Sequence, residues 1–535
     1  MKSRIGFIVI LVLTLSSTLP GFAEAPPAWT LAQANTETFR FATLFTAEDV
    51  GYRLSTQEQL DTAVQWCKEC GITHVFLETF RGGYLVPLAT LQKAKQRFVD
   101  EGFLVSGCIT TVGLGRKSVN GWIFPCFTEE GGMENLKHIF EYTAMNFDLI
   151  MIDDFFATQC QCEDCLKGKG ENSWAKFRTD RLVEVSQKYV LEPSRKVNPD
   201  VKIIIKYPQW YEDFHNRGYD TDRQTKMYDK TWVGTETRDP DNAEWGRHPQ
   251  YMAYFIMRWL GVNGGEKCGG GWFDPYGTSP ATYVEQARQT ILGGAREALL
   301  FCYGDLIGGN GPANIEAFRA ELPELFQLAA LVKDQPIEGI HAPRPISSDP
   351  IGDAYFYDFA GMLGLPLVPS EILDPQAQSA LLGAQVLKDP QAAEKIAALK
   401  KANTPVLITQ TLFNQLPDEL KADAASFQLL PTAEDKWWDW MKIENLDTIR
   451  NTVLAPHGVQ FTAPSRVALY LFAGTLTGIE NFNDQPVTVT LKRDGAVNWQ
   501  TVLTLKKENT VTCQTTDGVG TLIIPARTLV LLQSK

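Results

Sequence analysis

Carboxyl side chains that could carry out acid–base chemistry follow several short apolar runs of the sequence. Asp153 and Asp154 follow the run LIMI. Glu236 follows TWVGT, and Asp274 follows GGGWF. Hydrolysis of a glycosidic bond needs one carboxyl group that gives a proton and a second that acts as nucleophile or base. These acids therefore predict sugar chemistry, provided that the fold brings them together.

Polar and aromatic side chains near the ends of the same runs could bind a sugar. This second set consists of Glu78, Asp153, Tyr207, Trp210, Arg238, Trp272 and Tyr303. The structural alternative is that some of the acids only cap helices or form ion pairs with Lys206 and Arg238. The sequence contains no GxSxG motif and its six His are scattered, so serine or histidine catalysis has no support.

Four cysteines form the most specific local pattern. Cys160, Cys162 and Cys165 have the spacing C-x-C-x2-C, and Cys126 lies upstream in WIFPCF. Four thiolates on adjacent loops could form a closed tetrahedral zinc site. In an oxidising compartment the alternative is a Cys162–Cys165 disulfide, with Cys126 and Cys160 forming a second one. We favour structural zinc.

Eight β-type runs alternate with helical patterns in the first part of the chain. The runs are residues 39–45, 74–79, 104–109, 149–152, 201–207, 231–235, 271–273 and 299–303. The helical patterns between them include residues 57–70, 91–101, 133–145, 174–189 and 280–297. Strands that alternate with helices predict a parallel sheet, and eight such units fit a (β/α)8 TIM barrel. A doubly wound open sheet is the alternative. In a barrel, the acids above would meet at the carboxyl ends of the strands.

Two smaller domains are expected after the barrel. The proline-rich segment 341–350 indicates a linker. Apolar runs at 384–387 and 405–409 flank the helix-like segment 390–402 and predict an α/β domain, and the aromatic segment 436–441 is expected to pack between domains. Runs at 467–472, 487–492, 502–506, 520–525 and 528–532 predict a β-sandwich. The expected domains are thus 36–338, 339–435 and 445–535.

The N-terminus has the pattern of a secretory signal peptide. Lys2 and Arg4 precede an apolar run at 5–15, and small residues around Ala23 form a cleavage site. A retained membrane anchor is the alternative, but the run is shorter than the ~20 residues that span a bilayer. We expect residues 1–23 to be removed, leaving a secreted or periplasmic protein with no membrane attachment. The net charge of -13 disfavours nucleic acid as a partner.

Together these features resemble glycoside hydrolase family 42, the β-galactosidase-like enzymes. In that family one Cys precedes the fourth barrel strand, and C-x-C-x2-C and then Phe-Arg follow it, as Phe177-Arg178 do here. The resemblance covers nearly the whole mature chain. It implies a TIM barrel followed by a flavodoxin-like trimerisation domain and a small β-domain. It also implies a zinc cluster, a carbohydrate substrate and a homo-oligomer, specifically a trimer.

Two positions depart from the family pattern. The family ends its fourth strand with Asn-Glu, whose Glu is the acid/base, where this chain has Asp153-Asp154. The family's nucleophile on the seventh strand is a Glu, where this chain has Asp274. The resemblance therefore implies a distant relative or a separate family of the same clan. We expect a glycoside hydrolase of oligo- or polysaccharides, with Glu236 as a further catalytic candidate.

Two other functions fit parts of the same pattern. The loss of both family Glu residues would suit a non-catalytic carbohydrate-binding protein on a decayed barrel. Alternatively, an α-glycosidase of another barrel clan would use the Asp of the fourth strand as its nucleophile and an acid on the sixth, near Glu236. The residues that remain, several acids and aromatic walls, favour an enzyme.

The two Asp replacements predict a stereochemical outcome. Each Asp is one C–C bond, ~1.5 Å, shorter than Glu. Two shorter side chains on an unchanged backbone would widen a retaining gap of ~5–5.5 Å toward the inverting range of ~6.5–9.5 Å. We predict inversion, with Asp154 as acid and Asp274 as base. NMR of the first-formed anomer checks the predicted inversion. A retained anomer would contradict it. That result would instead suit Asp274 as a nucleophile on a shifted backbone.

Overall fold

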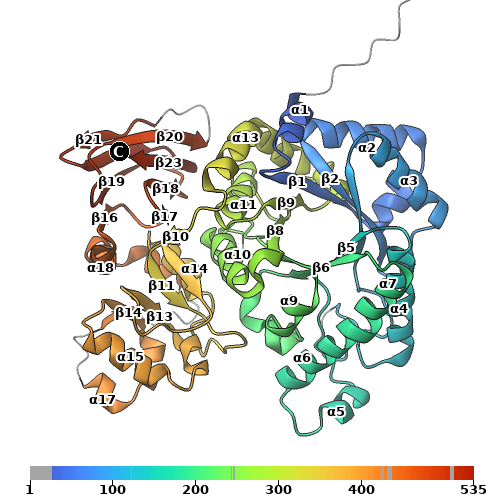
Figure 1. Cartoon of the computed structure of the whole chain (residues 1–535), viewed down its shortest axis with the longest axis horizontal. Coiled ribbons are helices and arrows are strands. Elements are labelled where there is room, and N and C mark those ends of the chain that lie inside the picture. Colours follow the sequence, from blue (N-terminus) through green and yellow to red (C-terminus); the bar gives the residue numbers. More distant parts are fainter. Residues whose placement is uncertain are drawn as a thin grey trace, which may run out of the picture.

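The structure, a computed structural model, describes residues 27–121, 123–242, 244, 248–422, 427–430, 437–505 and 511–535. The predicted signal peptide lies outside the described residues. Figure 1 shows the largest unit, coloured blue to yellow-green, beside two smaller units coloured orange and red. Among the described residues, no helix combines the length and the apolar character needed to cross a membrane.

Eight parallel strands close into a barrel. In chain order they are β1 (Arg40–Phe45), β2 (Ile72–Arg81), β4 (Leu104–Ile109), β5 (Leu149–Ile152), β6 (Lys202–Tyr207), β7 (Lys230–Gly234), β8 (Cys268–Phe273) and β9 (Glu297–Leu300). Each overlaps one of the predicted runs. The pairing of β1 with both β9 and β2 closes the sheet, so the predicted TIM barrel is confirmed and the open sheet is excluded. A two-residue strand, β3 (Tyr84–Leu85), extends β2 as a hairpin.

Helices surround the barrel, as the sequence predicts (Figure 1). The main ones are α2 (Gln57–Glu69), α3 (Leu88–Asp100), α4 (Glu130–Ala144), α6 (Trp174–Val185), α10 (Tyr251–Gly264), α11 (Pro280–Leu292) and α13 (Gly311–Val332). Shorter ones are α1 (Pro27–Ala34), α5 (Glu163–Lys169), α7 (Glu192–Val197), α8 (Phe214–Arg217), α9 (Arg223–Met227) and α12 (Tyr303–Leu306). Helix α11 starts at a capping box on Ser279, with Pro280 in its first turn. It ends at Leu292, earlier than predicted, because Gly293 and Gly294 follow and Glu297 already belongs to β9.

The barrel interior is filled by side chains rather than hollow. The inward-facing layer contains Ala42, Leu44, Phe76, Cys108, Met151, Ile204, Trp232, Trp272, Leu299 and Cys302. Successive side chains of a strand point to opposite faces, so the neighbours of these residues face the helices. This alternation decides which residues at the strand ends reach the mouth of the barrel.

The second domain has the flavodoxin-like topology. Its strands are β11 (Ile340–Pro343), β12 (Leu367–Ser370), β13 (Ala380–Leu382), β14 (Val406–Thr409) and β15 (Gln428–Leu430). All are parallel, and the spatial order β12-β11-β13-β14-β15 is the 2-1-3-4-5 order of flavodoxin. The helices with them are α14 (Phe356–Gly361), α15 (Ala392–Lys401), α16 (Gln410–Gln415) and α17 (Asp418–Lys421).

Two predictions for this domain were wrong in detail. The segment 341–350 is not a plain linker, because β11 occupies its start. Pro343 is the last residue of β11, a place where the missing N–H does not interrupt the ladder. The run at 384–387 is a 3₁₀ helix, η5 (Ala384–Lys388), and the strand lies just before it at β13.

The C-terminal part consists of two antiparallel sheets, in agreement with the predicted sandwich. One sheet contains β10 (Ile337–Glu338), β17 (Val467–Phe472), β18 (Leu476–Asn481), β23 (Thr528–Ser534) and β20 (Trp499–Leu505). The other contains β16 (Val459–Thr462), β19 (Val487–Arg493), β22 (Val519–Ile524) and β21 (Gln514–Thr516). Before them lie η7 (Trp437–Lys442) and α18 (Leu446–Leu454). Trp440 of η7 is buried in the core that continues from the barrel into these sheets, whereas Lys436 lies outside the described residues.

Replacement of glycine by alanine is predicted to have opposite effects on stability at two positions. A Cβ at Gly270 in β8 would lie 2.1 Å from the ring of Trp232, which is packed inside the barrel. We expect Gly270→Ala to lower the free energy of unfolding by about 1–3 kcal/mol. A Cβ at Gly261 in α10 meets no atom within 4 Å, so Gly261→Ala should raise it by about 1 kcal/mol. Urea unfolding measures the free energy of unfolding of both variants. A Gly270→Ala protein as stable as the wild type would contradict the close packing of Trp232 against Gly270.

Candidate active site at the barrel mouth

A buried ion network fixes the base of the mouth. Asp153, which follows β5, accepts hydrogen bonds from Lys206 Nζ at 2.6 Å, Arg81 Nη2 at 2.6 Å and Thr110 Oγ1 at 2.9 Å. Glu78 accepts from Arg81 Nε at 2.8 Å and from the Ala47 N–H at 2.7 Å. Burial opposes the ionisation of Asp153, but Lys206 and Arg81 outweigh it and hold the pKa of Asp153 below its usual range.

Asp154 is in a different electrostatic position from its neighbour. Burial, and then the negative charge of Asp153, raises the pKa of Asp154 to about 7, although Lys206 and Arg81 act in the other direction. The hydroxyl of Tyr219 donates a hydrogen bond of 2.8 Å to the backbone oxygen of Asp154. Asp154 therefore titrates in the pH range where a group can both give and accept a proton.

Glu236 and Asp274 lie together at the ends of β7 and β8. Asp274 is bound by Arg238 in two-pronged fashion, with Nε–Oδ1 at 2.9 Å and Nη2–Oδ2 at 2.6 Å. Arg238 has a left-handed backbone with φ of 56°, and its N–H donates to Gln286 Oε1. Glu236 lies farther from Arg238, at 3.9 Å, and its Oε2 has no hydrogen-bond partner among the described residues. Burial, and then the charge of Asp274, raises the pKa of Glu236 well above its usual range.

The structure thus brings the predicted acids to one mouth. Asp154 and Asp274 both act on the pKa of Glu236, and all three act on Arg238. The charge of Asp274 is matched by Arg238, and that of Asp153 by Lys206 and Arg81. Of the acids predicted for the site, Asp154 and Glu236 form no ion pair of comparable closeness within the described part of the chain.

Three predicted sugar-binding aromatics do not reach the mouth, and these predictions were wrong. Tyr207 follows Lys206 along β6, so it points outward and packs against the rings of Phe214 and Tyr219. Tyr303 is buried against Phe45 and Trp66, between the barrel and α2. Trp272 is 1% exposed inside the barrel. The Lys206 ammonium lies over the Trp272 ring, at 3.8 Å from its centre.

Of the remaining predicted binding residues, three are engaged in ion pairs and the fourth packs against neighbouring aromatic rings. Glu78 and Asp153 are fully engaged in the ion network, and Arg238 is engaged with Asp274, so their first role in this structure is to hold the site together. Trp210 is half-buried and packs against Phe124 and Tyr219.

A cleft of about 600 Å³ lies beside the network, at the ends of β1, β2 and β9. Its walls include Asp49, Tyr52, Arg81, Tyr276, Phe301 and Asp305. Sequence reasoning missed Arg81 because it ended the second strand at Thr79, two residues too early. The loop after α8 that carries Tyr219 gave no signal at all.

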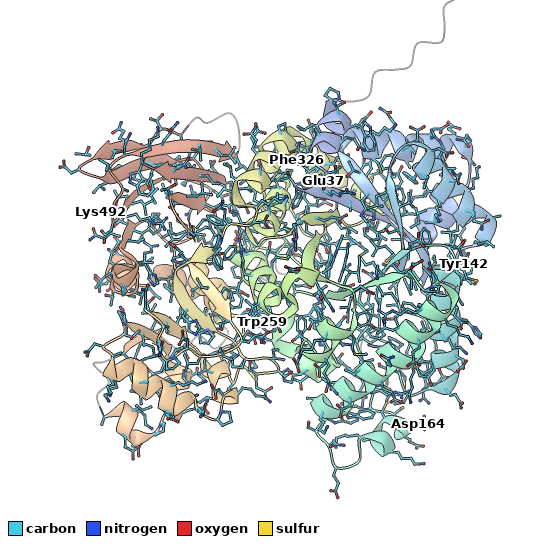
Figure 2. The ribbon with its side chains drawn as sticks, in the orientation of Figure 1. Glu37, Tyr142, Asp164, Trp259, Phe326 and Lys492 are labelled. Atoms are coloured by element: carbon cyan, nitrogen blue, oxygen red, sulfur yellow. The ribbon has the colours of Figure 1, made fainter. Side chains whose placement is uncertain are left out.

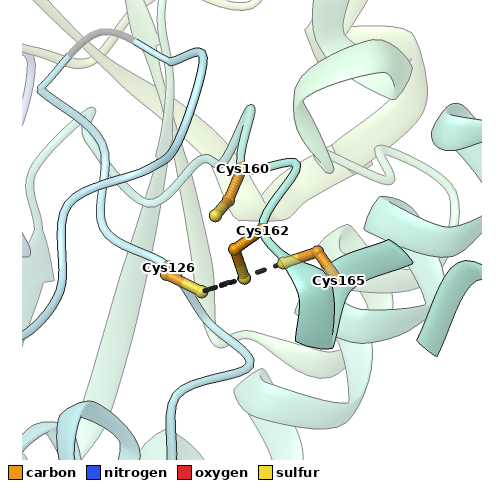
Figure 3. A group of neighbouring side chains, drawn as sticks. All are labelled: Cys126, Cys160, Cys162 and Cys165. Carbon is orange, nitrogen blue, oxygen red and sulfur yellow. Dashed lines mark hydrogen bonds between the residues drawn. The ribbon is translucent and has the colours of Figure 1, made fainter. Parts of the chain in front are cut away.

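The four cysteines form a second, separate site on the loops after β4 and β5 (Figure 3). Cys126, Cys160, Cys162 and Cys165 have sulfur atoms all within 4.8 Å of one another. Cys126 Sγ lies 3.8 Å from the Sγ of both Cys162 and Cys165. Trp174 and Phe177 pack against the cluster. Figure 3 shows Cys126, Cys160 and Cys162 on loops and Cys165 on a helix, which is α5.

The cluster fits a bound metal ion. Four zinc–sulfur bonds of ~2.3 Å in a tetrahedron place the sulfur atoms about 3.8 Å apart. The structure has that spacing between Cys126 and two of its neighbours, whereas sulfur atoms joined in a disulfide are ~2.05 Å apart. Each of the four cysteines is a free thiol here. Arg116 Nη2 lies 3.1 Å from Cys162 Sγ and would partly balance the charge of four thiolates.

Comparisons with known proteins identify the family. Residues 27–337 match a family described as "probable glycosyl hydrolase, catalytic domain", and this match covers more than half of the chain. The chain therefore belongs to that family.

One curated relative matches part of the chain. An uncharacterized protein of Saccharolobus solfataricus is 27% identical over 370 residues, which are 63% of this chain and 61% of that protein. The chain thus spans about three fifths of the length of this relative.

Solved structures share the fold. The α-L-fucosidase isoenzyme 2 of Paenibacillus thiaminolyticus has a TM-score of 0.61 at 10% identity, over 93% of this chain and 99% of that one. Gan42B, a GH42 β-galactosidase, has a TM-score of 0.57 at 10% identity, over 93% of this chain and 98% of that one. At 10% identity these likenesses show a shared fold, and membership of family 42 remains a prediction.

The electrostatics of the mouth predict the effect of removing Asp153. Asp153→Asn removes the charge that, after burial, most raises the pKa of Asp154. It also leaves Lys206 and Arg81 with less anionic charge to balance, which favours the ionised form of Asp154 further. The apparent pKa near 7 in the pH dependence of kcat/KM should therefore move downward.

The matched control is Asp229→Asn, next to β7 at the opposite end of the barrel. It should leave the profile of kcat/KM unchanged. An unmoved or upward-shifted pKa in the Asp153 variant would show that Asp153 does not set the titration of Asp154.

Proposed function

We propose that the protein hydrolyses glycosidic bonds of an oligo- or polysaccharide, with Asp154 and Glu236 as its working carboxyl pair. The observation that carries this proposal is that both acids sit at one barrel mouth with raised pKa values. Among the described residues Asp154 forms no ion pair, and Glu236 has only a 3.9 Å contact with Arg238, which binds Asp274 more closely. Carboxyl groups in glycosidases have these properties, because one must hold a proton near neutral pH.

Glu236 suits this role better than Asp274 because of what each already binds. Both oxygens of Asp274 accept hydrogen bonds from Arg238, and its side chain is only 2% exposed. The Oε2 of Glu236 is buried without a partner. An unpaired buried oxygen costs free energy, and a substrate oxygen that accepts the Glu236 proton would remove that cost.

The two pKa values support a division of roles. Glu236 has its pKa raised well above the usual range and would keep its proton, whereas Asp154, at about 7, ionises more readily. Glu236 would then protonate the leaving glycosidic oxygen while the Asp154 carboxylate bonds to the anomeric carbon. Water, losing a proton to the Glu236 carboxylate, would release the sugar and restore both groups.

This division of roles is the α-glycosidase alternative of the sequence analysis, and it predicts a retained anomer. Of the two structural neighbours, one is named an α-fucosidase and the other a β-galactosidase, so they support neither anomeric preference over the other.

A second assignment has Asp154 as acid and Asp274 as base. Its support is the ion pair between Arg238 and Asp274, which holds the Asp274 carboxyl group in place beside the mouth. It predicts inversion, and it predicts that activity falls as pH rises through about 7. The first assignment predicts that activity rises through about 7, since Asp154 must then be ionised.

Three variants separate the assignments. If Asp154 and Glu236 work together, Asp154→Asn and Glu236→Gln should each lower kcat by about 10²–10⁴-fold. Asp274→Asn loosens Arg238 and lowers the pKa of Glu236, but it removes neither working carboxyl group, so it should cost less. The measurement is the hydrolysis rate on the best substrate from a panel of α- and β-linked aryl glycosides and natural glycans.

Two outcomes would overturn parts of this proposal. Full loss in Asp274→Asn with activity kept in Glu236→Gln would establish the second assignment. Sugar binding by the wild-type protein without hydrolysis of any glycan would instead favour the binding-protein alternative.

We also propose that the four-cysteine cluster holds structural zinc. Cys126, Cys160, Cys162 and Cys165 would bind the ion as thiolates, with no open position for a substrate. The zinc site would then fix the far end of the loop that begins at Asp154.

Metal analysis of the purified protein should find about one zinc per chain. Cys165→Ser should lower the zinc content and the melting temperature, because one of four ligands is lost. Cys513→Ser is the matched control, since Cys513 lies in the C-terminal part of the chain and does not belong to the cluster. Full zinc content in Cys165→Ser, or none in the wild-type protein, would contradict the proposal.

Export and assembly are proposed on the sequence alone. The basic and apolar N-terminus supports secretion or a periplasmic location, and the flavodoxin-like domain supports a homotrimer through the family 42 resemblance.

A further inference from the structure

The flavodoxin-like domain meets the barrel at Glu212, two residues after Trp210. In the 2-1-3-4-5 strand order the connections switch direction between β11 and β13, and ligands of such sheets bind beyond the carboxyl ends of the strands at that point. Arg344 directly follows β11, and Gln385 follows β13. Here this position is filled by the carboxylate of Glu212, which comes from the barrel.

Every polar contact of the Glu212 carboxylate goes to the flavodoxin-like domain. Its Oε2 accepts a hydrogen bond from Arg344 Nη2 at 2.8 Å. Its Oε1 accepts from the Tyr355 N–H at 3.0 Å and from Gln385 Nε2 at 3.2 Å. Glu212 is 5% exposed and Arg344 1%, so this is a buried ion pair that joins two domains.

Aromatic contacts hold the same loop from the side. The Arg344 guanidinium lies 4.3 Å from the ring centre of Trp259 and 4.8 Å from that of Tyr211. Trp259 Nε1 donates a hydrogen bond of 2.9 Å to the Arg344 carbonyl. Figure 2 places Trp259 where the barrel meets the flavodoxin-like domain. The backbone beside Glu212 is thereby fixed on both sides.

The other end of this loop reaches the proposed catalytic residue. Trp210 packs against Tyr219 with 5.5 Å between ring centres. The Tyr219 hydroxyl donates to the backbone oxygen of Asp154 at 2.8 Å, and Tyr219 is fully buried. Contacts therefore lead from Arg344 to Glu212, the backbone leads from Glu212 to Trp210, and contacts lead on from Trp210 through Tyr219 to Asp154.

We propose that Glu212 is a positioning residue, through which the flavodoxin-like domain fixes Trp210 and Tyr219 against the backbone of Asp154. The inference rests on the proposed function, because that function assigns Asp154 to the reaction. It gives the flavodoxin-like domain a direct part in the chemistry of the same chain, in addition to any part in assembly.

The test compares Glu212→Gln with Glu480→Gln. Gln keeps the size of Glu212 and can still accept from Tyr355, but it lacks the charge that faces Arg344. Glu480 in β18 is the matched control, because it is also fully buried and binds a barrel arginine, Arg288, at 3.3 Å. It joins the barrel to the C-terminal sheets and has no part in the loop at 207–219.

Two readouts are expected to separate the variants. Backbone hydrogen exchange in peptides covering 207–219 should be at least about tenfold faster in Glu212→Gln than in the wild-type protein, and unchanged in Glu480→Gln. On the best aryl glycoside, kcat of Glu212→Gln should fall at least about tenfold, with KM within about threefold. Tyr219→Phe should lower kcat similarly, and the double variant should fall no further, because both changes break one chain of contacts.

Each other result has a definite meaning. Equal exchange in Glu212→Gln and Glu480→Gln, or a loosened loop with unchanged kcat, overturns the positioning role. A loosened loop in a protein whose wild type hydrolyses no glycan overturns the proposed function, and it supports the anchoring of the loop by Glu212.

Discussion

The site depends on one physical constraint, the need to bury charge at the mouth of a filled barrel. A charge removed from water must be paired and hydrogen-bonded. Asp153 meets this condition through Lys206 and Arg81, which also reaches Glu78. Because the network spans the ends of β2, β5 and β6, it fixes where these strands stop. It also leaves Asp154, whose pKa burial already raises, beside a negative charge that raises this pKa further.

The other features of the mouth follow from the same constraint. Arg238 binds Asp274 closely and lies farther from Glu236, at 3.9 Å. The loop after β5 leads within a few residues from Asp154 to the cysteine cluster, and the loop after β6 is held by the flavodoxin-like domain. Each of the two loops nearest Asp154 is thus anchored outside the barrel, one by thiols and one by Arg344. Sequence segments remote from the acids therefore contribute to their placement.

Much of the architecture could be predicted because its signals are local. The barrel strands are short apolar runs with carboxylates or glycines at their ends, so periodicity finds them. Strand β11 was missed because Pro343 and the prolines that follow it resemble those of a linker. Side-chain direction was the main source of error at the site. Lys206 and Tyr207 are neighbours in one strand and cannot both enter the barrel, yet sequence reasoning placed both at the mouth. The pairing of Arg238 with Asp274 depends on a left-handed backbone that no local pattern reveals.

The charge balance around Asp154 and Glu236 determines which sign of charge the mouth attracts. Glu78, Asp153 and Asp274 are balanced by Arg81, Lys206 and Arg238. Any negative charge that develops on Asp154 or Glu236 is therefore in excess. Such a mouth attracts positive charge, and glycosidic cleavage passes through an oxocarbenium-like state that carries it. The excess negative charge would therefore stabilise the positive charge that develops only while the glycosidic bond is breaking.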